Sequence, residues 1–173
     1  GKAFYIPFGH EKQEVSQLEE KIVLQKLKPF LEKAKNKIIG QNIKFDRNIL
    51  ARYGIQINSI KNDTMMMSYI LDASATRHNL DALSSYYLNH KTSTFEEVAG
   101  KGVKQVTFDK VPLDLATNYA AEDADITLRL YEVLEPKLDS IKPLKRLMED
   151  IEIPLIEVLS DMEQNGTLLN SKI

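Results

Sequence analysis

The sequence contains no cysteine, no long apolar run and no excess of basic residues. Without cysteine, the chain can form neither disulfide bonds nor thiolate metal sites, and a cytosolic location is favoured. No apolar run approaches the roughly 20 residues needed to cross a bilayer, and no secretory signal opens the chain. The net charge of −2 gives no basic footprint for nucleic acid, although an enzyme that acts on a strand end needs only a local one.

What the chain does contain is sufficient for one domain with a real core, because 43% of its 173 residues are hydrophobic. Helical patterns dominate and strand patterns are few and short, which indicates an α/β class with a small sheet. Strands are expected at residues 1–9, 37–41 and 55–60. Helices are expected at residues 11–35, 45–53, 64–71, 80–88, in a short stretch after Thr94, from Pro112 to about Leu134, and at 144–164.

Small polar residues and prolines predict where these elements start and stop. Asp63 and Asn79 are suited to cap the helices that follow them, and Thr94 with Glu97 has the spacing of a capping box. Helix ends are expected at Gly54 and Asn165-Gly166. Kinks or breaks are expected at Pro29, Pro136, Pro143 and Pro154.

Tyr119 and Asp123 are the first candidates for a functional site. They lie four positions apart in the longest helical pattern, so a phenol and a carboxylate share one face. Asp46 follows a strand candidate, and we hypothesise that it meets Asp123 in space to hold metal ions. Hydrolysis of a phosphodiester by two metals requires carboxylates from different elements, because Mg²⁺ and Mn²⁺ prefer oxygen ligands. Asp125 is expected to point to solvent from another face.

Each of these residues also has a simpler interpretation. Asp46 can be an ordinary charge at a helix start, Asp123 an exposed helical residue, and Tyr119 an amphipathic core tyrosine. The same choice applies to the polar and apolar residues near them. Gln41 and Asn42 either pair with local backbone or bind a phosphate or sugar, and Arg77 is either solvated or neutralises a phosphate. Phe95 either anchors its helix or stacks on a base, and Met65 begins a run of methionines typical of a core.

Taken together, these residues resemble a known family. Gln41-Asn42-x-x-Phe45-Asp46 is similar to the second motif of proofreading 3′–5′ exonucleases, and Tyr119-x-x-x-Asp123 is similar to the third. The order and spacing resemble most closely the proofreading domain of family A polymerases, the bacterial DNA polymerase I type. Supporting stretches are Asp63-Thr-Met65, Arg77-His78, His90-Lys-Thr-x-Thr-Phe-Glu-Glu97, Ala99-Gly-Lys-Gly102, Ile153-Pro-Leu and Met162-Glu-x-Asn-Gly166. The resemblance covers essentially the whole chain.

The resemblance implies a ribonuclease H-like exonuclease fold, helix-rich with a small mixed sheet and truncated at the N-terminus. It implies removal of mispaired 3′ nucleotides from single-stranded DNA ends with two divalent metal ions, Mg or Mn. Asp46 and Asp123 would be metal ligands, and Tyr119 would position the attacking water. The residues implied to line the strand-end site are Gln41, Asn42, Phe45, Met65, Arg77 and Phe95.

The resemblance also implies a domain division and a setting. Residues 1–140 would form the exonuclease-like domain, and residues 141–173 would form a helical connection into the polymerase domain of the same parent chain. The location would be the bacterial cytoplasm, in association with the nucleoid, with no membrane partner.

One departure from the family pattern limits the expected activity. The first motif, Asp-x-Glu on an early strand, should precede Gly1 and is not in the chain, which would leave residues 1–9 without a neighbouring strand. Asp150-Ile-Glu152 and Asp161-Met-Glu163 cannot replace it, because positions two apart on a helix point roughly 200° apart. We therefore expect weak metal binding and little or no hydrolysis by this chain alone. The alternatives are a non-catalytic domain that supports a polymerase or binds single strands, and an RNA-trimming exonuclease.

Overall fold

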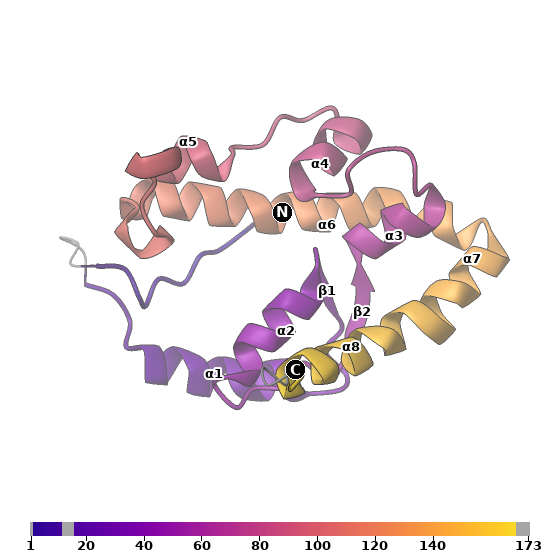
Figure 1. Ribbon diagram of the computed structural model, residues 1–173, viewed down its shortest axis with the longest axis horizontal. Coiled ribbons are helices and arrows are strands. Elements are labelled where there is room, and N and C mark those ends of the chain that lie inside the picture. The colour runs from indigo at the N-terminus through magenta and orange to yellow at the C-terminus, as the bar shows by residue number, and fades with distance from the viewer. Residues whose placement is uncertain (1, 12–15, 169–173) are drawn as a thin grey trace, which may run out of the picture.

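The computed structural model describes residues 2–11 and 16–168. Helices make up most of this part of the chain, with two short strands between them (Figure 1). The elements are α1 Glu20–Glu32, β1 Ile38–Gly40, α2 Ile43–Ala51, β2 Ile60–Asp63, α3 Thr64–Leu71, α4 Leu80–Leu88, α5 Phe95–Ala99, α6 Leu113–Asp139, α7 Lys142–Leu147 and α8 Ile153–Asn165. Two 3-10 turns, Gly102–Lys104 and Phe108–Lys110, precede α6, and a π-helical turn, Met148–Glu152, separates α7 from α8.

The two strands pair in parallel, with α2 as the connection between them. Ile38 pairs with Ile60 and Gly40 pairs with Asp63, with an irregularity between Ile38 and Ile39. Both strands therefore end at the same edge, where α2 and α3 begin. Gly40 is required at this edge, because a Cβ atom there would lie only 2.7 Å from the Cβ of Ile43. The helix-rich α/β class with a small sheet is confirmed, and the pairing observed within the described ranges is parallel rather than mixed.

Asp63 joins the two strand ends to the two helices. Its buried carboxylate accepts hydrogen bonds from the amides of Met65 (2.9 Å) and Met66 (3.3 Å), as predicted for a cap of α3. It also accepts from the amides of Asn42 (3.1 Å) and Ile43 (2.7 Å) at the start of α2, which was not predicted. Asn42 adopts the left-handed conformation at this point, so α2 begins two residues earlier than expected.

The largest core cluster lies along α6. Leu130, Leu134 and Leu138 are buried together with Met67 of α3 and Leu83 of α4. α4 and α5 cover one side of α6, while α3 and the edge of β1 approach it from the side of the strands (Figure 1). No helix in the described parts of the chain is both long enough and apolar enough to span a lipid bilayer.

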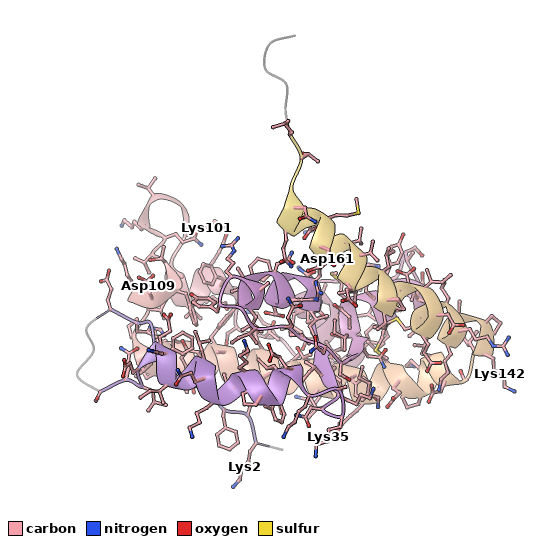
Figure 2. The ribbon with its side chains drawn as sticks, turned by 90° about the horizontal axis from the view of Figure 1, so that it is seen from below. Lys2, Lys35, Lys101, Asp109, Lys142 and Asp161 are labelled. Carbon is pink, nitrogen blue, oxygen red and sulfur yellow. The ribbon has the colours of Figure 1, made fainter. Side chains whose placement is uncertain are left out.

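After α6 the chain turns back and carries α8 across to α2 (Figure 1). Figure 2 shows Lys142 at this turn, at the opposite end of the molecule from Lys101 and Asp109. The kink expected at Pro154 takes the form of the π-helical turn just before it. A proline ring clashes with the carbonyl group four residues earlier, and the wider π turn relieves that clash.

Four predictions about the elements were wrong. The helix expected at 11–35 extends, within the described residues, only over Glu20–Glu32. Residues 2–9 form no strand, because the aromatic side chains pack instead: the ring of Tyr5 lies 6.2 Å from that of Phe108. A backbone hydrogen bond from Glu11 to Asp109 follows this segment. The strand expected at 55–60 lies at Ile60–Asp63, so the alternating residues before it are a buried loop. Pro136 does not end α6, since it lies in the last turn, where one lost hydrogen bond matters little.

The caps can be tested by substitution. Asp63→Ala removes one buried acceptor from four amides, so it is expected to lower the free energy of unfolding by about 2–4 kcal/mol. Asn79→Ala removes a single cap bond to Ala82 and is expected to cost about 1 kcal/mol. Urea unfolding followed by circular dichroism measures both values. Equal costs for the two substitutions would contradict a role for Asp63 in both α2 and α3.

Candidate functional site

Asp46 and Asp123 line the same cavity. This cavity has a volume of about 550 Å³ and lies where the end of β1, α2, the start of α4 and the middle of α6 come together. Its lining residues are Ile39, Gly40, Gln41, Asp46, Leu80, Asp123, Ala124, Thr127 and Leu128. The structure therefore brings together two carboxylates that are 77 positions apart in sequence and come from different helices.

These two carboxylates differ from the acidic residues around them. Asp63, Asp81 and Glu122 all accept hydrogen bonds from protein groups. No hydrogen bond or ion pair joins the side chain of Asp46 or Asp123 to another residue in the described ranges, although the Asp46 carboxylate accepts a hydrogen bond from its own backbone amide. A carboxylate in a partly enclosed position normally needs a partner. Most acceptor positions of these two carboxylates are therefore left open for a ligand.

The surroundings raise the pKa of both cavity carboxyls to about 6. For Asp46, partial burial is the main cause, followed by the negative charge of Asp63. For Asp123, burial is again the main cause, followed by the charges of Asp81 and Glu122. The side chain of Asp46 is open to water on the cavity side, so its desolvation is incomplete. Both shifts show that negative charge is costly here and that a cation in the cavity would lower this cost.

The residues present fit a divalent cation in part. Carboxylate oxygens are the ligands that Mg²⁺ and Mn²⁺ prefer, and two of them border one cavity. In the parts of the chain that the structure describes, no group of three or more histidine, cysteine, aspartate or glutamate residues is arranged to hold a metal ion. Asp46 and Asp123 thus provide an incomplete ligand set.

Tyr119 lies one turn before Asp123 in a cluster of aromatic rings. Its ring is 6.3 Å from that of Phe95 and 5.9 Å from that of Phe108. Burial, and then the negative charge of Asp123, raise the pKa of the tyrosine, so it keeps its proton at neutral pH. The half-buried phenol can therefore offer a hydrogen bond close to the cavity carboxylates.

The loop before α5 is fixed to α6 by Glu122, beside Asp123. The Glu122 carboxylate bonds the ring of His90 (2.9 Å) and accepts a hydrogen bond from the amide of Ser93 (2.8 Å). The capping box predicted at Thr94 and Glu97 is present and starts α5 at this point. These contacts hold Phe95 next to Tyr119.

A family of 3′–5′ exonucleases found in A-type DNA polymerases matches residues 2–139. The chain belongs to this 3′–5′ exonuclease family. It is 46% identical to DNA polymerase I of Pseudomonas aeruginosa over 100% of this chain and 19% of that protein. It is 43% identical to DNA polymerase I of Rhizobium leguminosarum over 91% of this chain and 15% of that protein. The chain therefore spans about a fifth of the length of these relatives, or less.

A solved structure supports the exonuclease fold. The polymerase-domain structure of Pol1 from M. smegmatis, in complex with a DNA primer-template and dNTP, covers 87% of this chain with a TM-score of 0.66. The match covers 22% of that structure's chain, at 20% sequence identity, and so bears on the fold alone. The resemblance found in the sequence motifs is confirmed at the level of the family.

Gln41 has a structural role in this exonuclease domain. Its amide nitrogen donates to the backbone oxygen of His78 (2.9 Å), and its amide oxygen accepts from the hydroxyl of Thr64 (2.5 Å). Gln41 borders the cavity, but these two bonds occupy its amide group. They hold the loop that contains Arg77 near the start of α3. Arg77 itself is exposed.

The remaining predicted strand-end residues lie around the same sheet edge. Asn42 and Phe45 are exposed at the start of α2, and 63% of the Phe45 side chain is open to solvent. Met65 is half-buried in the first turn of α3. Phe95 is 38% exposed beside Tyr119. The assignment of all these residues to a DNA-binding site stays a prediction.

Several residues of the site were missed in the sequence. Leu80, Thr127 and Leu128 line the cavity, and Glu122 fixes the loop before α5. Glu122 lies between Tyr119 and Asp123 in the sequence, and this position could have identified it as a residue of the site. Nothing local pointed to Leu80, which reaches the cavity through the packing of α4 on α6. Asp125 was predicted correctly to lie away from the cavity, since it pairs with Arg129 at 3.6 Å.

The raised pKa values predict how stability depends on pH. A folded pKa of about 6 lies above the ordinary aspartate value of 3.8, so the folded protein binds these protons more tightly than the unfolded chain. Without metal, the free energy of unfolding should therefore fall as the pH rises from about 4 to 6. Asp123→Asn should flatten this slope and raise the free energy of unfolding at pH 7 by up to about 1 kcal/mol, a value reduced for exposure.

Urea unfolding at several pH values between 4.5 and 7, in the presence of a chelator, measures this effect. Asp46→Asn should act in the same direction, and the double substitution should remove most of the slope. Added Mn²⁺ should increase the stability of the unsubstituted chain at pH 7 and have little effect on the double variant. An unchanged slope in the double variant would show that these carboxyls are not the groups that titrate.

Proposed function

We propose that this chain is a proofreading 3′–5′ exonuclease domain that hydrolyses the 3′-terminal phosphodiester bond of DNA with two divalent metal ions. The observation that supports this most directly is the shared cavity of Asp46 and Asp123, two carboxylates without partners among the described residues. RNA trimming, the other exonuclease chemistry considered, is disfavoured by the DNA polymerases among the relatives. A place in the bacterial cytoplasm, at the nucleoid, follows from the same proposal.

In this proposal Asp46 and Asp123 hold the metal ions. When bound, the ions activate the attacking water and stabilise the leaving oxygen. Tyr119 orients the water through its phenol hydroxyl, which lies one helical turn from Asp123. The aromatic cluster around Tyr119 restricts its ring, so the hydroxyl is held in place before substrate binds.

The end of a single DNA strand would bind beside the cavity. Phe45 and Phe95 are exposed enough to stack on bases, and stacking tolerates any sequence because every base has a π face. Arg77 is exposed on a loop that Gln41 holds in place, where it can neutralise a phosphate. Asn42 and Met65 would complete the surface at the starts of α2 and α3.

We further propose that the chain by itself binds metal weakly and hydrolyses DNA slowly or not at all. Two carboxylates are fewer oxygen ligands than two metal ions require, even when each ion keeps several waters. A domain that holds single strands without cutting them is the alternative, and the incomplete ligand set at the cavity favours it. Binding of a single-stranded oligonucleotide that does not depend on Mn²⁺ or on Asp123 would support the alternative.

Release of the 3′-terminal nucleotide from a labelled single strand, with Mn²⁺, tests the proposed activity. The chain alone should release little, whereas a full-length polymerase that contains it should release the nucleotide readily. In that polymerase, Asp123→Ala should lower the rate at least about 100-fold, and Tyr119→Phe roughly 10- to 100-fold. Asp125→Ala, two residues away on the same helix, should have little effect. Equal rates for Asp123→Ala and Asp125→Ala would contradict the assigned site.

We also propose that residues 141–173 connect this domain to the polymerase domain of a longer parent chain. The family match ends at residue 139, where α6 ends. Beyond it, α8 exposes an apolar stripe at helical spacing, made of Leu155, Val158, Leu159 and Met162. The relative from Pseudomonas aeruginosa is a polymerase about five times as long as this chain, which supports the proposal that the polymerase domain would cover the stripe.

A charge in the apolar stripe tests this partner. Val158→Lys should leave the thermal stability of the isolated chain unchanged, because 53% of this side chain is exposed. In a full-length polymerase the same substitution should lower the midpoint of the exonuclease domain by several degrees, since a lysine would be buried at the interface. Val103→Lys, at a fully exposed loop position, is the control. Equal effects of the two substitutions in the polymerase would contradict the proposed contact.

A further inference from the structure

Arg47 follows Asp46 in the sequence but points to a different side of α2. Only 4% of its surface is exposed, although it carries a full charge. Adjacent positions on a helix point about 100° apart, so Asp46 can face the cavity while Arg47 faces α8. The buried face of α2 carries Arg47 between Ile43 and Leu50. These two apolar side chains pack in one cluster with Ile156 of α8.

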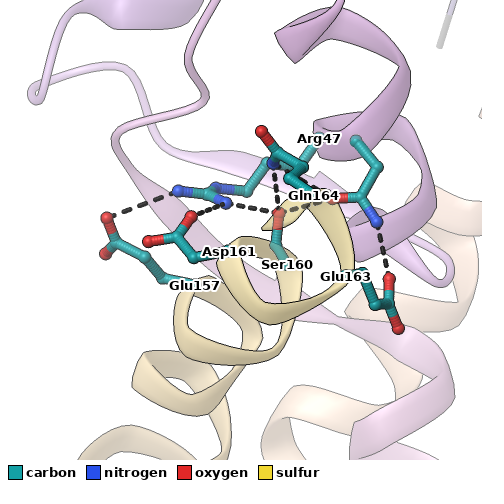
Figure 3. A network of polar contacts seen from close by, with 7 residues as sticks. Arg47, Glu157, Ser160, Asp161, Glu163 and Gln164 are labelled. Atoms are coloured by element: carbon teal, nitrogen blue, oxygen red, sulfur yellow. Dashed lines mark hydrogen bonds and ion pairs between the residues drawn. The ribbon is translucent and has the colours of Figure 1, made fainter. Parts of the chain in front are cut away.

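The guanidinium of Arg47 donates hydrogen bonds to three side chains on one face of α8 (Figure 3). One nitrogen donates to the hydroxyl of Ser160 and to the carboxylate of Asp161 (3.1 Å), and the other donates to the carboxylate of Glu157 (3.4 Å). Positions 157, 160 and 161 are three and four apart, so they present their side chains together. The planar fork of arginine matches this arrangement, and lysine would reach only part of it.

A second set of bonds surrounds the first. The Ser160 hydroxyl donates to the side-chain oxygen of Asn48 (2.5 Å), and the Asn48 amide donates to Glu163 (2.6 Å). Gln164 donates to both Ser160 (3.0 Å) and Asn48 (3.3 Å). Figure 3 shows these side chains meeting between the two helices. Because these contacts run in several directions, they fix both the rotation of α2 about its axis and its position along α8.

A buried arginine is an expensive way to join two helices. Removing its charge from water is unfavourable, and apolar residues of similar volume often stabilise such an interface equally well or better. The directional hydrogen bonds of the Arg47 guanidinium, however, allow α2 only one orientation against α8. Helix α2, which has nine residues, also carries Asp46 at the cavity, so its orientation sets the position of that carboxylate.

We propose that Arg47 is a positioning residue of the exonuclease site. By anchoring α2 to α8, it holds the Asp46 carboxylate at the cavity that it shares with Asp123. Helix α8 lies outside the stretch that matches the exonuclease family, so the segment leading toward the polymerase takes part in building the site. This inference rests on the proposed function of Asp46 and Asp123 as metal ligands.

The test compares two ways of breaking the anchor with a control. Arg47→Met removes the guanidinium, and Glu157→Gln combined with Asp161→Asn removes its exposed partner charges. Each should weaken Mn²⁺ binding to the chain about tenfold, measured by calorimetry, because supporting contacts around a metal ligand have effects of this size. Lys44→Met removes an exposed ion pair with Glu163 between the same helices and should change the affinity less than twofold.

Hydrogen exchange in the absence of metal provides a second measurement. The amides of α2 should exchange faster in the two anchor variants, while those of α3 should exchange at the original rate. In a full-length polymerase, the anchor variants should need more Mn²⁺ for half-maximal nuclease activity and recover most of their rate at saturating Mn²⁺. Arg47→Lys should lie between the original protein and Arg47→Met. A general loss of structure would not be recovered by metal.

The possible outcomes separate the two proposals. The chain alone is expected to bind Mn²⁺ weakly, so a full-length polymerase that contains it is the deciding case. If the nuclease activity of that polymerase with Mn²⁺ does not depend on Asp46 and Asp123, the proposed metal site fails and the positioning role fails with it. If the unsubstituted chain binds Mn²⁺ but Arg47→Met binds equally well, the metal site stands and the inference is overturned. Should Arg47→Met prevent folding, the exposed Glu157 and Asp161 variant decides the result. Unchanged exchange in α2 overturns the anchor whether or not metal binds.

Discussion

The carboxylate of Asp63 is the constraint on which the site depends. It is buried at the end of β2 and accepts hydrogen bonds from two amides at the start of α2 and two at the start of α3. Burial raises the pKa of Asp63, and the four amides oppose that shift by stabilising its charged form. With one side chain, the fold satisfies donors that would otherwise be left unpaired at two helix ends, and it places both helices at one edge of the sheet. The cavity with Asp46 lies at this edge.

The acidic residues near the cavity divide into two groups by what they bind. Asp63, Asp81 and Glu122 are used by the protein: they cap helices or hold the loop before α5. Asp46 and Asp123 have no such partners among the described residues; burial is the main cause of their raised pKa values, and the charges of the first group raise them further. The same negative charges that build the scaffold thus make the cavity unfavourable for further negative charge. A divalent cation would relieve this, which connects the scaffold to the proposed chemistry.

Features set by neighbouring residues could be predicted from the sequence. The caps at Asp63, Asn79 and Thr94 each bond to amides two or three residues away, and all three are present. The strand expected at 55–60 was misplaced because alternation describes burial, and a buried loop alternates as well as a strand does. The shared cavity of Asp46 and Asp123 was predicted from motif order, since nothing local links them. Arg47 shows the limit: its partners lie more than 100 residues away, and its sequence neighbours give no sign that it is buried.

The position of Arg47 suggests why this domain does not end with α6. A carboxylate pair that is unpartnered and partly buried is unfavourable by itself, and a short helix carrying one member of it could relax by rotating toward water. The apolar contacts of Ile43 with α8 resist separation but define rotation poorly, because apolar packing is not directional. The guanidinium of Arg47 defines it well, since each of its bonds has a direction. Helix α8 supplies the acceptors of Arg47. In the proposed site these contacts keep Asp46 at the cavity, so that site would depend on a segment beyond the residues that match the family.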